Sequence, residues 1–77
     1  MTAEPTTPAD VWALIERADE LIKYASNRDP ATAYAQARET LEHALAAACS
    51  VPGAAPLEQQ ARTRLDDIAR LEGGAAT

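Results

Sequence analysis

The residues best suited to chemistry in this chain are its single cysteine, Cys49, and its single histidine, His43. A nucleophile and its general base must share one face of their helix. Six residues along a helix separate two side chains by roughly 120° around the axis and by about 9 Å along it. The spacing therefore excludes a Cys–His dyad. We expect Cys49 to be a buried or half-buried packing residue, as free cysteines commonly are.

A second candidate is a metal site formed by Glu39, Glu42 and His43, which follow one another at helical ligand spacing. These side chains project away from the helix faces that we assign to the core below, whereas metal sites in helical bundles project inward. A solvated helix face is the simpler interpretation. The alternative function, an oligomeric enzyme or metal carrier, requires a dimer to bury this face. We predict no resident metal, cofactor or catalytic residue.

Other catalytic patterns also fail. Glu16, Asp19 and Glu20 gather carboxylates on one side of a helix, but a general acid needs burial to raise its pKa, and this face is expected to be exposed. The three glycines form no phosphate-binding loop. The serines, Ser26 and Ser50, fall at predicted helix ends, so the chain lacks the modified serine of an acyl carrier protein. We predict that the protein is not an enzyme.

Charge and hydropathy exclude two classes of partner. The 77 residues carry 7 Lys and Arg against 12 Asp and Glu, a net charge of −5. Binding to nucleic-acid phosphates needs clustered basic residues, so no nucleic-acid partner is expected. The longest apolar run, residues 44–49, is far shorter than a membrane span. We predict a cytoplasmic protein with no membrane insertion, and the single cysteine agrees with a reducing compartment.

The first element that must position these residues is a helix over about residues 8–26. Thr7 supplies an N-cap hydroxyl, Pro8 suits the first helical position, and Asp10 places a carboxylate in the first turn. Apolar residues then recur every three or four positions and form one buried face. They are Val11, Leu14, Ile15, Ala18, Leu21, Ile22 and Ala25.

A second helix is expected over about residues 30–49, after a tight junction. Asn27 can adopt the left-handed conformation that ends a helix, Asp29 can cap the next one, and Pro30 suits its first turn. So short a linker predicts an antiparallel hairpin. The helix carries two apolar stripes, which imply two helical neighbours. The larger contains Tyr34, Leu41, Leu45 and Ala48, and the smaller contains Ala33, Ala37, Thr40, Ala44 and Ala47.

A third helix is predicted over about residues 56–72, opened by Pro56 and stopped by Gly73 and Gly74. Its stripe contains Leu57, Ala61, Leu65, Ile68 and Leu71. The fold class is therefore all-α, an antiparallel three-helix bundle over residues 8–72. Residues 1–7 and 73–77 are expected to be flexible tails.

Alanine dominates the apolar residues. The chain has 19 alanines but only 12 Leu, Ile and Val together, and no Phe. Alanine at successive turns lets two helix backbones approach closely, so the core can be dense although it is shallow. Twelve aliphatic side chains supply little hydrophobic stabilisation to offset the conformational entropy of the chain. A monomer is expected to be marginal, and a partner would stabilise it.

Three side chains are not required by the bundle. Trp12 and Tyr24 flank the buried face of the first helix, where we expect partial exposure. Either they anchor an interface, or Trp12 covers the loop at residues 50–55 and Tyr24 flanks the core. Arg38 interrupts the large stripe of the second helix. It can pair with Glu42, which we favour, or reach a carboxylate on another helix or subunit.

Three segments together resemble the microtubule-interacting and trafficking (MIT) domain. They are Ala18-Asp-Glu-Leu-Ile-Lys-Tyr-Ala25, Asp29 with Ala33-Tyr-Ala-Gln-Ala-Arg-Glu-Thr-Leu-Glu-His-Ala-Leu45, and the third-helix residues Arg62, Arg64, Leu65 and Leu71. The resemblance covers about residues 9–72. That family is a three-helix bundle related in shape to tetratricopeptide repeats, and it binds short peptides in grooves beside its third helix. The resemblance implies a similar fold and a peptide-binding role.

We therefore expect a non-catalytic protein–protein interaction module, serving as an adaptor or in oligomerisation, that packs a helix into a groove. The partner is a protein or peptide helix, or a second copy in a homodimer. Apolar residues of the second and third helices would line the groove, and arginines beside it would meet an acidic partner. The predicted contacts are Trp12, Tyr24, Leu57, Arg62, Arg64, Ile68 and Arg70.

Overall fold

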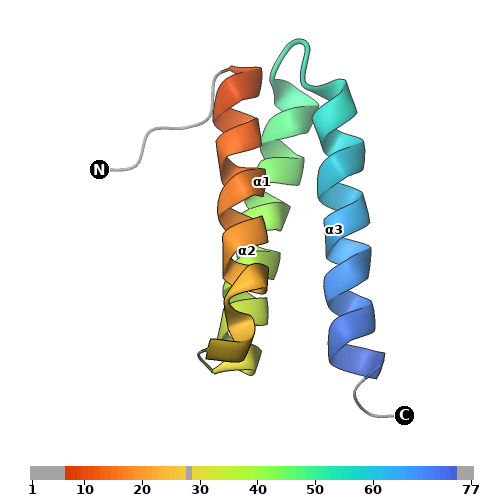
Figure 1. The fold of residues 1–77 in the computed structure, drawn as a ribbon. Helices are drawn as coiled ribbons and strands as arrows, with labels where there is room; N and C mark the ends of the chain where they lie inside the picture. Colours follow the sequence, from red (N-terminus) through yellow and green to blue (C-terminus); the bar gives the residue numbers. More distant parts are fainter. Residues whose placement is uncertain (1–6, 28, 75–77) are drawn as a thin grey trace.

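The computed structural model describes residues 7–27 and 29–74 and consists of three α-helices. Helix α1 spans Pro8–Lys23, α2 spans Pro30–Ser50 and α3 spans Ala55–Gly74, and successive helices run in opposite directions (Figure 1). The predicted antiparallel three-helix fold is confirmed. The predicted tails fall mostly on residues 1–6 and 75–77, which lie outside the described residues.

Helix α1 begins with the predicted cap. The Thr7 hydroxyl accepts a hydrogen bond from the Asp10 amide at 3.2 Å, and the Asp10 carboxylate accepts one from the Thr7 amide at 3.3 Å. This reciprocal pair is a capping box with Pro8 in the first helical position. The local sequence alone therefore fixes where the chain enters the fold.

The junction between α1 and α2 differs from the prediction. Helix α1 ends at Lys23, three residues early, and a 3₁₀ turn over Ala25–Asn27 follows. Asn27 does not take the left-handed conformation: among the described residues, only a glycine has a positive φ. Asp29 is the N-cap of α2, but its carboxylate accepts a hydrogen bond from the Thr32 hydroxyl at 2.7 Å and none from the backbone. The tighter turn supplies the chain reversal that a left-handed cap would have given.

The loop between α2 and α3 turns at Gly53, whose φ is 83°. Helix α3 begins at Ala55, one residue before Pro56, because the Glu58 amide donates the first α-helical hydrogen bond to the Ala54 carbonyl at 3.2 Å. The predicted stop at Gly73 is wrong, since the helix continues through Gly74. Glycine costs about 1 kcal/mol relative to alanine within a helix, which is too little to end one that is already propagating.

The core is built around α2. Its predicted small-residue stripe is largely buried, with Ala37 and Ala44 fully inaccessible to solvent, and the backbones of neighbouring helices can approach there. Helix α2 packs against both α1 and α3, which are the two helical neighbours that its stripes imply. The largest fully buried side chains come from all three helices and are Ile15, Leu41, Ile68 and Val11.

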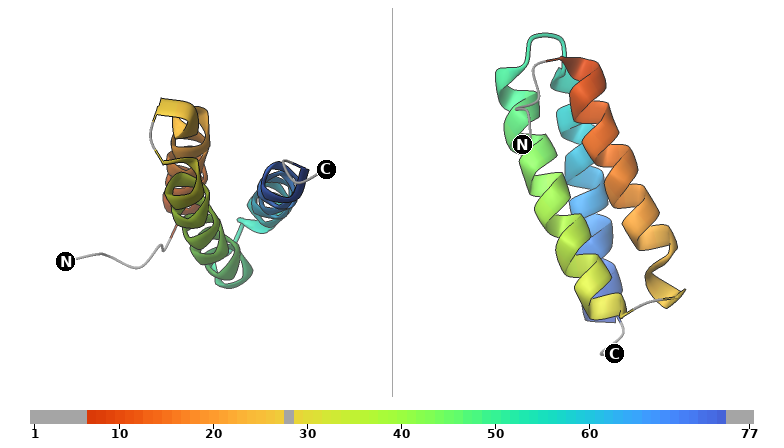
Figure 2. Two further views of the ribbon diagram at one scale, coloured as in Figure 1. Left: turned by 90° about the horizontal axis from the view of Figure 1, so that it is seen from below. Right: turned by 90° about the vertical axis from the view of Figure 1, so that its left-hand side faces the viewer.

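Helices α1 and α3 each pack on α2 but make few contacts with each other. Viewed end-on, the α1–α2 pair and α3 form the two arms of a V (Figure 2, left). The Cα atoms extend over 40 × 26 × 14 Å, which is thin in one direction. A fully closed triangular bundle would be more even in cross-section. Within residues 7–27 and 29–74, no helix covers the face between α1 and α3.

No helix in the described part of the chain combines the length and apolar character needed to cross a bilayer.

Candidate partner-binding surface

A side-chain bridge joins α1 to α3 near the middle of the open face. The Arg64 guanidinium donates to the Asp19 carboxylate at 2.7 Å and to the Gln60 side-chain oxygen at 2.8 Å. Its central carbon also lies 5.7 Å from the centre of the Trp12 ring, a cation–π distance. Trp12 is 38% exposed, as predicted. Trp12 and Arg64, two predicted contacts that are far apart in sequence, therefore belong to one surface.

Beside this bridge, the C-terminal halves of α1 and α3 border an open hollow of about 560 Å³, which we call the notch. Its apolar side chains are the half-buried Ile22 from α1 and Leu71 from α3, which is 45% exposed. The notch is lined by Asp19, Ile22, Lys23, Arg64, Asp67, Arg70 and Leu71.

The notch is locally basic on an acidic chain. It contains three cations and two carboxylates, whereas the whole chain carries a net charge of −5. Lys23 makes no ion pair with any described residue, and its ammonium lies 5.5 Å from the centre of the Tyr24 ring. Arg70 is 79% exposed and 3.5 Å from Asp67, an ion pair that solvent weakens. Lys23 and Arg70 stand on different helices of the notch and are available to an anionic group.

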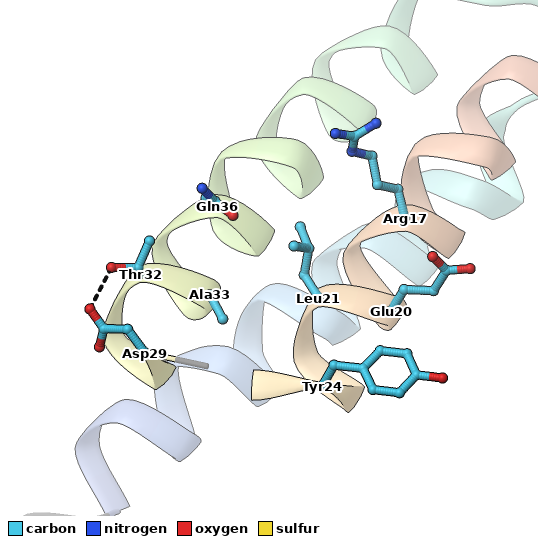
Figure 3. A pocket seen from close by; sticks show the side chains of 8 residues that line it. All are labelled: Arg17, Glu20, Leu21, Tyr24, Asp29, Thr32, Ala33 and Gln36. Carbon is cyan, nitrogen blue, oxygen red and sulfur yellow. Dashed lines mark hydrogen bonds between the residues drawn. The ribbon is translucent and has the colours of Figure 1, made fainter. Parts of the chain in front are cut away.

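Tyr24 lies at a different hollow, between α1 and α2 (Figure 3). This hollow has a volume of about 460 Å³. Leu21 and Arg17 line it from α1, and Gln36 lines it from α2. The Tyr24 ring points away from α2 in the close view, and the residue is 49% exposed. The two predicted aromatic anchors thus do not share a site.

Arg62 belongs to a third region, where α2 meets the start of α3. It forms an ion pair with Glu58 at 3.2 Å, one turn earlier in α3. The other oxygen of Glu58 accepts a hydrogen bond from the Cys49 thiol at 3.4 Å. Cys49 is exposed, so the prediction of a buried or half-buried thiol is wrong. Cys49 follows the buried Ala48 by one residue, which turns its side chain by about 100° around the helix axis and out of the core.

The hydrogen bond to Glu58 is the main reason that the pKa of the Cys49 thiol lies above its ordinary value. Partial desolvation and the negative charge of Glu58 act in the same direction, and the positive charge of Arg62 opposes them. A raised pKa means less thiolate at neutral pH, which is the opposite of an activated nucleophile.

Two predicted contacts lie in the core. Ile68 is fully buried, and the half-buried Leu57 packs against the same cluster. Ile68 therefore cannot contact a partner in the folded chain, which corrects the prediction. The physical reason is its register: Ile68 follows the buried Ala61 by seven residues, which is two helical turns, so both face α2 and α1.

Arg38 forms its ion pair with Glu72 of α3 and not with the favoured Glu42. This contact ties the last turns of α3 to the middle of α2. Of the residues that line the notch, sequence reasoning singled out Arg64 and Arg70 but missed Ile22, Leu71 and Lys23. Ile22 and Leu71 belong to the predicted buried stripes of their helices. Ile22 and Leu71 lie near the C-terminal ends of α1 and α3, which run in the same direction. Apolar residues at the same end of two parallel helices are the signal that could have identified them.

Comparisons of the chain with protein-family models, with curated proteins and with solved structures found no match. The geometry is that of a small three-helix all-α protein, and no family is identified.

Glu39, Glu42 and His43 are exposed on the outer side of α2. Residues 7–27 and 29–74 contain no group of three or more His, Cys, Asp or Glu side chains placed to hold a metal ion. A metal site at these residues would therefore need ligands from a second subunit.

Proposed function

We propose that the protein is a non-catalytic interaction module that binds a helix of another protein on the open face between α1 and α3. The observation that supports this most strongly is the notch. Two parallel helices rest on a third without closing on each other, and they leave Ile22 and Leu71 accessible beside Trp12 and Arg64.

The physical argument is burial. An amphipathic helix gains affinity by placing its apolar side chains in a hydrophobic groove, and partly exposed Trp and Arg side chains are the residue types that most often dominate such interfaces. The open face offers an apolar hollow at Ile22 and Leu71 and a partly exposed tryptophan beside an arginine. The resemblance to the MIT domain agrees with this role, because that family binds peptides beside its third helix. The groove differs from our expectation in lying between α1 and α3, whereas we predicted helices two and three.

The test uses Trp12, the only tryptophan, as a reporter. A panel of Trp-free amphipathic helical peptides is titrated into the protein while Trp12 emission is recorded. We expect at least one peptide to shift the emission with saturation, and Leu71→Asp to abolish binding because it places a charge in the notch.

The control is Ala46→Asp, which adds the same charge at an exposed position of α2. Equal binding by the Leu71→Asp and Ala46→Asp variants contradicts the proposal, and so does a panel in which no peptide binds. The alternative, an oligomeric enzyme or metal carrier, is tested separately by elemental analysis of the purified protein. Stoichiometric metal that is lost in His43→Ala favours the alternative.

We also propose a cytoplasmic location. Its support is the single cysteine, which cannot form a disulfide within the chain. Fractionation of cells that express a tagged chain tests it, and recovery outside the cytoplasm contradicts it.

A further inference from the structure

We infer that the segment bound at the notch is acidic and inserts a large aliphatic or aromatic side chain between Ile22 and Leu71. This inference rests on the proposed function and narrows it to one chemical class of partner. It is carried by the shape of the notch and by the charges at its edge.

The shape favours an anchor side chain. The volume of about 560 Å³ falls within the range of about 300–1,000 Å³ that is typical of sites for small molecules, so it accommodates one or two large side chains. The Arg64–Asp19 bridge connects α1 and α3 at one limit of the hollow. An inserted side chain would contact Ile22 from α1 and Leu71 from α3 and would remove apolar surface from water on both helices.

The charges favour an acidic segment. Arg64 is already neutralised by Asp19, but Lys23 has no ion pair among the described residues and Arg70 has only a solvent-exposed one. Carboxylates on either side of the anchor would pair with these two cations. The rest of this acidic chain repels an acidic segment, so the notch is the surface where such a segment is attracted.

The same charges disfavour a second copy as the occupant. A two-fold dimer brings the same patch together from both subunits, which would bring together two patches that each carry more cations than carboxylates. The two subunits would also each carry the net charge of −5.

The experiment compares two designed helical peptides of about 16 residues that share a central leucine. One carries glutamate and the other lysine at the flanking positions. Binding is measured by the anisotropy of a dye on each peptide and by Trp12 emission. We expect the glutamate peptide to bind at least about tenfold more tightly at about 0.02 M salt, and most of this preference to disappear at about 0.5 M salt.

Charge-reversal variants locate the effect. Arg70→Glu should reduce affinity for the glutamate peptide by about tenfold, and Lys23→Glu should act in the same direction. Arg17→Glu is the matched control, since it makes the same change of charge on α1 outside the notch. Lys23, Arg70 and Arg17 are all exposed, and circular dichroism checks that each variant is folded.

The outcomes separate this inference from the proposed function. If a peptide binds in a Leu71-dependent manner but does not distinguish Arg70→Glu from Arg17→Glu, the acidic partner is excluded and the interaction module stands. If sedimentation shows a dimer that Leu71→Asp dissociates, a second copy covers the notch and the inference is overturned. If no peptide binds and the chain is monomeric, both proposals fail.

Discussion

At the scale of single residues, the contact between Cys49 and Glu58 controls the reactivity of the only thiol. The thiol donates to the carboxylate, which raises its pKa because ionisation would bring two negative charges together. Exposure alone would suggest a reactive cysteine. Because the neighbouring carboxylate raises the thiol pKa, we expect Cys49 to react slowly with electrophiles.

Replacing Glu58 with glutamine should therefore accelerate alkylation of Cys49. Removal of the negative charge lowers the thiol pKa, so the thiolate fraction at pH values below that pKa rises and the rate increases by about two- to tenfold. The rate of reaction with a chromogenic disulfide, followed against pH, should show its midpoint at lower pH in Glu58→Gln than in the wild type. Glu39→Gln is the control, and an equal acceleration in that variant would exclude a local effect.

Rotation around one helix predicted the exposure of Trp12 correctly but not that of Cys49. Contacts between two helices could not be predicted. The partial exposure of Trp12 followed from its angle to the apolar stripe. The error at Ile68 arose because one residue was assigned both to the stripe and to the partner surface. Arg38 pairs with Glu72, a residue of another helix, and the packing of α3 on α2 had to be known to see it.

At the scale of helices, the capping box at the start of α1 joins Thr7 and Asp10 across the first turn. Thr7→Ala should lower the free energy of unfolding by about 1 kcal/mol, because the hydrogen bond from the Asp10 amide to the Thr7 hydroxyl is lost. Urea denaturation followed by circular dichroism measures this change. Thr63→Ala, at an exposed position within α3, should leave the midpoint unchanged or slightly higher. A similar loss in both variants would contradict a role for the cap.

The alanine stripe of α2 makes a second prediction at this scale. Ala44 is fully buried where α2 packs on its neighbours, so Ala44→Leu should force the helices apart and cost about 1–3 kcal/mol of stability. The same substitution at the exposed Ala46 should be nearly neutral. Thermal unfolding of the two variants provides the comparison. Equal stability would show that the packing at Ala44 is loose.

Helix starts were more predictable than helix ends. Pro8 and Pro30 fix the first turns of α1 and α2, because proline at the first helical position sacrifices no hydrogen bond. Asn27 and Gly73 only permit a left-handed end. The energetic difference between stopping and continuing is about 1 kcal/mol at such positions, and packing decides between them.

At the scale of the whole molecule, α3 is attached mainly to α2 and through few large side chains. Ile68 is the largest side chain that α3 buries fully. Ile68→Ala should therefore cost about 2–5 kcal/mol, which is a large share of the stability of so small a domain. Amide hydrogen exchange should show α3 losing protection before α1 and α2. Leu71→Ala, at an exposed position, should change stability little, and an equal loss there would contradict this account.

The open face could not be predicted from the sequence. The tight junction near Asp29 predicted the antiparallel hairpin, and the two stripes of α2 predicted two neighbours. Neither observation sets the angle between those neighbours. The end-on view shows α1 and α3 spread apart around α2 (Figure 2, left), and the notch lies between their C-terminal halves.

An odd number of antiparallel helices places the start of α1 and the end of α3 at opposite ends of the long axis (Figure 1). A stretching force applied between Thr7 and Gly74 would therefore act along the α1–α2 and α2–α3 seams and load all their contacts at once. A two-helix hairpin pulled at its adjacent ends would instead separate one turn at a time. Tension would therefore load the domain in shear, and the Arg38–Glu72 and Arg64–Asp19 pairs connect helices that would have to slide past one another.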